Sequence, residues 1–290
     1  MAIFNLGSIN ADMTYRLPHL LAPGETLATS RLTRGLGGKG ANMSVAAARA
    51  GARVVHLGAV GPDGRWAIER LTEYGVDTRQ IAVIEEATGH AIIMLDAEAE
   101  NSILIHPGAN RALSVERIEA GLEEAGPEDI FVFQNETNLQ REAAEIASRR
   151  GLRVAYAAAP FDAEAVTAVL PLLDLLVLNE VEAAQLEEAT GQGIESIPVR
   201  DVVVTLGAKG CRWINTDSGE SRNFAALPVT PVDTTGAGDT FTGYLLAGLD
   251  RALPMATAIE LAQRAAALMV MREGTADVIP DLKDVTEHRF

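Results

Sequence analysis

The sequence predicts an α/β protein, in which short hydrophobic strands alternate with alanine-rich helices. Runs rich in β-branched residues recur along the chain and most precede a helical stretch; Gly51 and Gly75 end two of these helices. The 290 residues are 48% hydrophobic, which is enough to bury a large core and excludes an intrinsically disordered chain. Because no internal repeat and no Pro/Ser linker divides the sequence, we expect one domain over residues 1–290.

The expected elements follow one another in order. Strands are expected at Ile3–Leu6, Val54–Leu57, Ile130–Phe133, Val154–Ala157, Leu175–Leu178 and Val202–Leu206, and helices at Ala41–Ala50, Trp66–Tyr74, Leu139–Arg150, Ala163–Leu170, Glu180–Ala189, Asp239–Leu249 and Met255–Met271. Two stretches, at about residues 13–36 and 90–106, carry β-rich patterns with no helix between them. Within the second, His90–Leu95 and Ser102–Ile105 flank the acidic turn Asp96–Asn101, as hairpin strands do. We interpret both stretches as strands of a small accessory sheet inserted into the main body.

Composition limits the partners of the chain. Lysine and arginine number 24 and aspartate and glutamate 40, so the formal net charge is −16. Such an acidic surface repels phosphate backbones, and we expect neither nucleic-acid nor membrane partners, although backbone N–H groups can still hold a small nucleotide. The single cysteine, Cys211, excludes an internal disulfide framework and a cysteine-cluster metal site. With no apolar run of about 18 residues and no signal-peptide pattern, we expect a cytoplasmic protein.

The sharpest chemical motif is Thr234-Thr235-Gly236-Ala237-Gly238-Asp239, which comes directly before an expected helix. Small residues at a helix start let successive backbone N–H groups point at an anion, and the helix dipole adds to the attraction. Asp239 follows these residues, where a bound phosphate would lie, so it is placed to accept a proton from an attacking hydroxyl. The structural alternative is that Asp239 only caps the helix. The motif alone leaves both interpretations open.

A second glycine-rich segment, Arg34–Asn42, contains the spacing Gly35-x-Gly37-x-x-Gly40 of a dinucleotide-binding turn. That fingerprint requires a buried strand before it, whereas Thr29–Arg34 is polar and basic. A Walker A loop is excluded because Gly40 stands where that motif needs Ser or Thr. We interpret the segment as a turn whose backbone approaches a ligand closely, with Lys39 and Asn42 as polar partners. A helix-entry turn with a solvated lysine is the alternative.

Three further turns follow expected strands. Gly7–Asp12 contains Asn10 and Asp12, a pair that can hold vicinal hydroxyls. Asn179–Glu182 offers an amide and a carboxylate that can hold Mg²⁺ through water, and Thr205–Gly210 is bounded by glycines. Each turn alone is also typical of an ordinary cap. Open α/β sheets bind ligands at the carboxyl ends of their strands, so five such turns together indicate one crevice.

Together these segments resemble the PfkB family of carbohydrate kinases, and within it the ribokinases, over nearly the whole chain. Asn10-x-Asp12 and Gly37–Asn42 look like the first family signature, Thr234–Phe241 like the highly specific second, and Asn179-x-x-Glu182 like the metal-associated N-x-x-E. Ala99–Asn110 and Gln134–Thr137 are similar to the G-E-N…I-H-x-G-A-N and Q-x-E-T stretches of ribokinases. The resemblance implies a Rossmann-like three-layer α/β/α domain of the ribokinase-like fold, with the two irregular stretches forming a β-sheet lid.

The implied activity is ATP-dependent phosphorylation of a primary hydroxyl of a sugar, with D-ribose giving ribose 5-phosphate as the first choice. The resemblance implies that Asp239 is the general base and that Gly236, Ala237 and Gly238 form the anion hole. It implies a sugar site of Asn10, Asp12, Gly38, Lys39, Asn42 and Glu136, with Ala91, Ile93 and Ile105 as apolar lid contacts. ATP would lie across Asn179, Thr205, Gly207, Lys209, Gly210 and Gln263, and Glu182 would hold Mg²⁺ through water.

The resemblance also implies activation by a monovalent cation such as K⁺, held by Asp233, Thr235, Met269, Arg272 and Gly274. This sequence departs from the family pattern at two positions. Val278 stands where the loop after the last helix usually has a serine, so backbone oxygens would have to replace a hydroxyl ligand. Met43 follows Asn42 where ribokinases commonly have a polar residue, which bears on the choice of sugar. We also expect a homodimer through the lid, because an open sheet exposes strand edges.

The sequence is also compatible with other functions. Another sugar or a nucleoside could be the acceptor, since the lid decides what is admitted. A nicotinamide-dependent oxidoreductase is supported only by Gly35-x-Gly37-x-x-Gly40, and preference for ATP over NAD would exclude it. A non-catalytic sensor of sugar or nucleotide is disfavoured by the presence of Asp239 behind its glycines.

Overall fold

The computed structural model describes residues 1–98 and 100–290, and within them the main body is built on a nine-stranded sheet in the order β13-β12-β11-β10-β9-β8-β1-β4-β5. Its strands are β1 (Ile3–Leu6), β4 (Val54–Val60), β5 (Ile81–Val83), β8 (Ile130–Gln134), β9 (Arg153–Ala157), β10 (Leu175–Asn179), β11 (Asp201–Thr205), β12 (Cys211–Asn215) and β13 (Glu220–Phe224). Neighbouring strands are parallel except for β12, which runs antiparallel to both of its neighbours. The carboxyl ends of the parallel strands therefore share one edge of the sheet.

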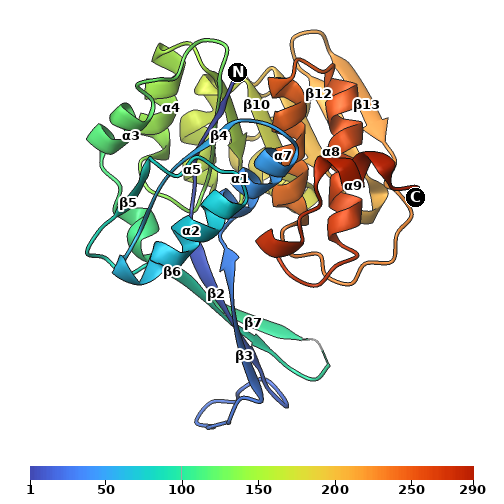
Figure 1. Cartoon of the computed structure of the whole chain (residues 1–290). Helices are drawn as coiled ribbons and strands as arrows, with labels where there is room; N and C mark the ends of the chain where they lie inside the picture. The colour runs from blue at the N-terminus through green and yellow to red at the C-terminus, as the bar shows by residue number, and fades with distance from the viewer. Residues whose placement is uncertain (99) are drawn as a thin grey trace.

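Helices cover both faces of this sheet (Figure 1). One face packs against α1 (Lys39–Arg49), α2 (Arg65–Glu73), α7 (Ala237–Asp250), α8 (Met255–Met269) and α9 (Leu282–Glu287), and the other against α3 (Val115–Gly121), α4 (Gln140–Arg149), α5 (Ala163–Val169) and α6 (Glu180–Thr190). Each face has its own hydrophobic core, which confirms the three-layer α/β/α architecture expected from the alternating pattern. No helix in the described part of the chain is both long enough and apolar enough to span a membrane.

A second, four-stranded sheet forms the lid. It consists of β2 (Asn10–Arg16), β3 (Arg31–Gly37), β6 (Gly89–Leu95) and β7 (Asn101–His106) in the order β3-β2-β6-β7, and it projects from one end of the body (Figure 1). The two irregular stretches of the sequence thus pair with each other, since β2 is parallel to β6. Ala99, in the predicted turn between β6 and β7, lies outside the described residues.

The dinucleotide spacing falls in the lid. Gly35 and Gly37 lie on β3, whose pairing with β2 is antiparallel and whose first four residues are exposed. A dinucleotide fingerprint needs a buried parallel strand at this position. The structure therefore removes the only support for a nicotinamide-dependent enzyme.

Several elements were not predicted from the pattern, namely β5, β12, β13, α3 and α9. The hairpin of β12 and β13 is the clearest example, because four of the five residues of β13 are exposed and only Phe224 is buried. An edge strand of this kind lacks the hydrophobic run that identifies the central strands. The helices that were expected begin and end within about two residues of their predicted limits, the usual uncertainty of a helix terminus.

Candidate active site

Polar side chains from four segments of the chain come together beneath the lid. Asp12 lies on β2, Asn42 on α1, Glu136 follows β8, and Asp239 lies in the first turn of α7. Asn42 Nδ2 donates a hydrogen bond to Asp239 Oδ2 over 2.9 Å, joining α1 to α7. The charges of Glu136 and Asp239 both reach Asp12 and raise its pKa, so the three carboxyls form one electrostatic cluster.

Asp239 is buried, with 9% of its surface exposed. It does not cap α7: the N-cap is Gly236, with φ 75°, and the carboxylate is held by Asn42 instead. Burial raises the pKa of Asp239 above its ordinary value and Glu136 adds to the rise, while Lys39 and the Asn42 hydrogen bond oppose it. A carboxyl with a raised pKa is a better proton acceptor at neutral pH. The capping interpretation of Asp239 is thus not what the structure shows.

Asp12 and Lys39 complete the charges of this cluster. Burial raises the pKa of Asp12 to about 7, and the negative charges of Glu136 and Asp239 add to the effect. The pKa of Lys39 is raised, mainly by Asp239 and also by Glu136 and Asp12. Because the charges of four carboxyls, the fourth being Glu182, reach one ammonium group, this region is rich in hydrogen-bond acceptors, as a site for a polyhydroxylated ligand requires.

Two asparagines frame the cluster. Asn10 Oδ1 accepts from Asn110 Nδ2 over 2.8 Å, and Asn110 Oδ1 accepts from Ile9 N over 2.9 Å, so the orientation of Asn10 is fixed by a buried neighbour. Asn42 Oδ1 is buried and has no hydrogen-bond partner among the described residues. Leaving such an atom unpaired is costly, and the side chain is held in place by the bond from its Nδ2 to Asp239.

The lid presents apolar side chains on the same side as Asp12. Across the lid sheet Asp12 pairs with Ala91, and Ala91 pairs with Ile105. Ile93 lies two residues beyond Ala91, and alternate residues of a strand share a face. The predicted lid contacts therefore share one face of the sheet with Asp12. Ala91 is buried, whereas Ile105 is 54% exposed.

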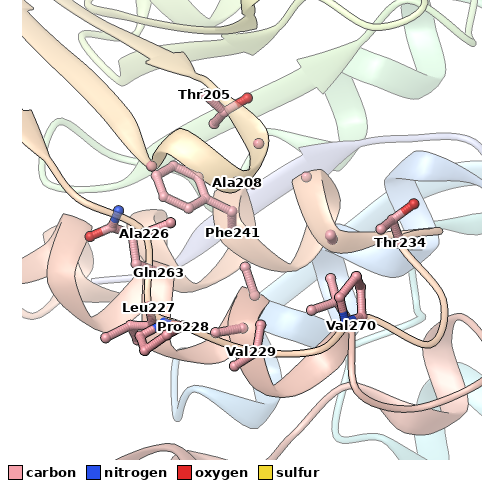
Figure 2. Close-up of a pocket in the computed structure, with 17 residues that line it drawn as sticks. Thr205, Ala208, Ala226, Leu227, Pro228, Val229, Thr234, Phe241, Gln263 and Val270 are labelled. Atoms are coloured by element: carbon pink, nitrogen blue, oxygen red, sulfur yellow. The ribbon is translucent and has the colours of Figure 1, made fainter. Parts of the chain in front are cut away.

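A separate apolar cavity of about 540 Å³ lies between β11, α7 and α8 (Figure 2). Its walls are the residues Thr205, Gly207, Ala208, Gly210, Ala226, Leu227, Pro228, Val229, Pro231, Thr234, Ala237, Gly238, Phe241, Gln263, Ala266, Ala267 and Val270. A largely apolar cleft of this size with a few polar groups suits an aromatic base with its sugar. At Ala237 and Gly238 the cavity reaches the turn that precedes Asp239, so the cavity adjoins the polar cluster beneath the lid there.

Four of the six residues expected to hold ATP line this cavity: Thr205, Gly207, Gly210 and Gln263. The other two do not. Lys209 is exposed and forms an ion pair with Glu180 over 3.2 Å, and Asn179 caps α6 by accepting from Glu182 N. The apolar segment Ala226–Val229 was missed by sequence reasoning. Its proline-containing apolar run was a weak signal, because only the packing of α8 turns it into a cavity wall.

The turn before α7 supplies free hydrogen-bond donors. Ala237 N donates to Thr234 O over 3.2 Å, which removes it from the expected set of anion ligands. In the described part of the chain, the backbone N–H groups of Gly236 and Gly238 have no protein acceptor. Free N–H groups at the positive end of a 14-residue helix have the geometry and partial charge that suit an anion.

The segment proposed for a monovalent cation is tied together by Asp233. Its Oδ1 accepts from Thr235 N over 2.9 Å and its Oδ2 from Gly274 N over 3.1 Å, while Val232 N donates to Val270 O over 2.7 Å. The loop after α8 is thereby held against the anion-binding turn. The side chains of two other expected ligands point elsewhere, since the Met269 side chain packs near Gly236 and Arg272 donates to Val278 O and pairs with Asp284, so only their backbone oxygens could serve the cation.

Glu182 is the residue expected to hold Mg²⁺. Its Oε2 accepts from Asn179 N over 2.8 Å in a capping box, so one carboxylate oxygen serves the helix. Burial raises the pKa of Glu182, and the opposing influence of Lys39 shows that its charge reaches the cluster beneath the lid. The described residues contain no group of three or more His, Cys, Asp or Glu side chains able to hold a metal ion. The other carboxylate oxygen of Glu182, Oε1, is not used by the capping box and suits a hydrated Mg²⁺ bound through water.

The chain belongs to the pfkB family of carbohydrate kinases, whose family model matches residues 3–282. It is an ATP-dependent sugar kinase. A buried carboxyl beside free N–H groups at a helix start is compatible with phosphoryl transfer. It is 35% identical to the ribokinase of Haemophilus influenzae over 297 residues, covering 97% of this chain and 96% of that protein.

Solved ribokinase structures have the same fold over nearly the whole chain. The structure from Cryptococcus neoformans in complex with ADP has a TM-score of 0.83 at 32% identity, covering 99% of both chains. The structure from Arabidopsis thaliana with ribose and ATP has a TM-score of 0.86 at 27% identity, covering 99% of this chain and 98% of that one.

Proposed function

We propose that this kinase transfers the γ-phosphoryl group of ATP to a primary hydroxyl of D-ribose, forming ribose 5-phosphate. The observation that carries the proposal is the meeting of two sites: the apolar cavity ends at Gly238, and the polar cluster beneath the lid begins at Asp239. Ribokinases dominate the relatives, and one of their structures holds both ribose and ATP.

In this arrangement Asp239 takes the proton of the attacking hydroxyl as the O–P bond forms, a contribution of about 10²- to 10⁴-fold. The N–H groups of Gly236 and Gly238 receive the negative charge that develops on the transferred phosphoryl group. Asp12, Asn42 and Glu136 hold the hydroxyls of the sugar and bring its primary hydroxyl to Asp239. Glu182 would hold Mg²⁺ through water, and the ion would supply positive charge to neutralise the phosphates of ATP.

The apolar face of the lid closes over the sugar and excludes water, which protects ATP from hydrolysis. We further propose that oxygens of Asp233 and of the loop around Gly274 would hold a K⁺ ion close to the turn before α7. Val278 supplies no hydroxyl ligand, so we expect weak K⁺ binding that saturates only at high concentration.

We also propose a cytoplasmic enzyme that forms a homodimer through the lid. Four apolar residues of the lid expose between 49% and 63% of their surface, namely Leu32, Ile103, Leu104 and Ile105.

An acceptor screen tests the function. ADP release is measured with ATP and Mg²⁺ over D-ribose, 2-deoxyribose, fructose, adenosine and other ribosides, each with KCl and with NaCl at equal ionic strength. We expect the highest kcat/KM for D-ribose and faster turnover in KCl. A higher kcat/KM for a nucleoside would assign the chain to the nucleoside kinases of the family. Equal rates in the two salts would show that the cation site is not used.

A further inference from the structure

Helix α1 begins at Lys39 with a glycine at its N-cap, so no N-cap side chain satisfies its first N–H groups. Groups that are distant in the sequence accept hydrogen bonds from these N–H groups instead. Lys39 N donates to Glu136 Oε2 over 3.1 Å, Gly40 N to Ser8 Oγ over 3.2 Å, and Ala41 N to Ser8 O over 2.9 Å. Ser8, which follows β1, and Glu136, which follows β8, therefore cap α1 together.

Ser8 and Glu136 also bond to each other. Ser8 is fully buried, and its Oγ donates to Glu136 Oε2 over 2.5 Å. A serine hydroxyl has a single hydrogen, so this donor is committed to Glu136. Oε2 thus accepts from both Ser8 and Lys39, whereas no protein donor reaches Oε1 in the described part of the chain.

The backbone around Ser8 leaves no room for a different arrangement. A Cβ on Gly40 would lie 2.3 Å from Gly7 Cα and 2.4 Å from Ser8 N, far inside van der Waals contact. The turn after β1 and the start of α1 are therefore in direct contact, and only glycine fits where they meet. This contact holds the Ser8 hydroxyl at one place relative to Glu136.

We infer that Ser8 is a positioning residue for the acceptor. By holding Oε2 of Glu136, Ser8 and the first turn of α1 leave Oε1 as the oxygen that accepts from a sugar hydroxyl. The charge of Glu136 reaches Asp12 and Asp239, so the carboxylate faces the acceptor cluster. The inference rests on the proposed function, which places Glu136 in the sugar site.

A double-mutant cycle tests whether Ser8 acts through Glu136. Ser8→Ala is expected to lower kcat/KM for the acceptor on the order of tenfold, mainly through KM, because a hydrogen bond to a charged group is lost. In a Glu136→Ala background the same change is expected to cost less than about twofold. Acceptor binding measured by calorimetry supplies the same cycle without turnover. An equal loss from Ser8→Ala in both backgrounds would overturn the inference.

Ser44→Ala is the matched control. Ser44 is as buried as Ser8 and bonds to Asn5 and His56, but it does not contact Glu136. We expect it to lower the melting temperature without changing KM for the acceptor. If Ser8→Ala changes the melting temperature and KM for the acceptor only as Ser44→Ala does, Ser8 has a structural role alone. The cycle uses whichever acceptor the wild type phosphorylates best, so failure of D-ribose as substrate is distinguishable from failure of this inference.

Discussion

Asp12 illustrates how a binding residue can oppose the stability of its own protein. Its carboxyl is held beside Glu136 and Asp239 and largely out of water, so its pKa rises to about 7. Between about pH 4 and pH 7 the folded chain keeps a proton that the unfolded chain has released, and stability falls as the pH rises through this window. Above pH 7 the buried charge opposes folding fully. In the proposed sugar site, hydroxyls that donate to the carboxylate would relieve this cost.

Asp12→Asn is therefore expected to stabilise the free enzyme by about 1–3 kcal/mol at pH 8 and to have a much smaller effect at pH 4. The amide has the same shape but carries no charge to bury. The same variant should raise KM for the sugar and leave KM for ATP unchanged. Urea unfolding at the two pH values, together with steady-state kinetics, measures both effects. If the variant is less stable than the wild type at pH 8, the buried charge of Asp12 does not destabilise the fold, and this interpretation is refuted.

Among the elements, the start of α7 carries the most chemistry. Gly236 has φ 75°, a conformation that costs other residues about 1–2 kcal/mol, and a Cβ there would lie 3.2 Å from Met269 Cε. The adjoining N–H groups are aimed by this turn. A small rotation of the turn moves the donors away from the phosphoryl oxygens, so the conformation matters for rate as well as for stability.

Gly236→Ala is expected to lower kcat at least about tenfold and to destabilise the fold by about 1–2 kcal/mol. Gly191→Ala is the matched control, because Gly191 also has a positive φ, 67°, but ends α6 with open space around its Cα. It should lose similar stability with kcat unchanged. Thermal unfolding and initial rates of the two variants compare the effects directly. Equal kcat values in both variants would mean that the turn has no catalytic role.

The elements also show how far the sequence could be interpreted. The residues of the Gly236–Asp239 turn are consecutive and a helix start fixes their geometry locally, so the motif predicted free N–H groups at Gly236 and Gly238, but not the bond from Ala237 N to Thr234 O. Lys209 was expected at the nucleotide, but its direction depends on Glu180, which lies on another element. The wall at Ala226–Val229 and the edge hairpin of β12 and β13 likewise depend on packing between distant segments. The meeting of Asp12, Asn42 and Asp239 was expected from the motifs, whereas contacts that no motif marks, such as that of Lys209 with Glu180, were not.

At the scale of the whole molecule, the lid projects from the main body and exposes apolar side chains (Figure 1). Leu104, the most exposed of its large apolar residues, is 63% exposed on β7, one of the two edge strands of the lid sheet. An edge strand with exposed apolar side chains favours pairing with a second copy. The proposed homodimer would cover this strand and hold the lid in place.

Leu104→Lys is expected to convert the dimer to a monomer, because a charge on the edge strand opposes pairing. Sedimentation velocity at micromolar concentration measures the change. Val181→Lys, an equally exposed residue on α6 of the main body, is the control and should leave the mass unchanged. A wild type that sediments as a monomer would remove the lid dimer from the account.

The central claim is that Asp239 accepts the proton of an acceptor hydroxyl while ATP lies in the adjoining cavity. The most direct measurement compares sugar-dependent ADP release by the wild type and by Asp239→Asn, with ATP and sugar affinities determined by calorimetry. Asparagine keeps the shape of the side chain but cannot take the proton. The account predicts a loss of at least about 10²-fold in kcat with both affinities nearly intact. An unchanged kcat, with only KM raised, would contradict it.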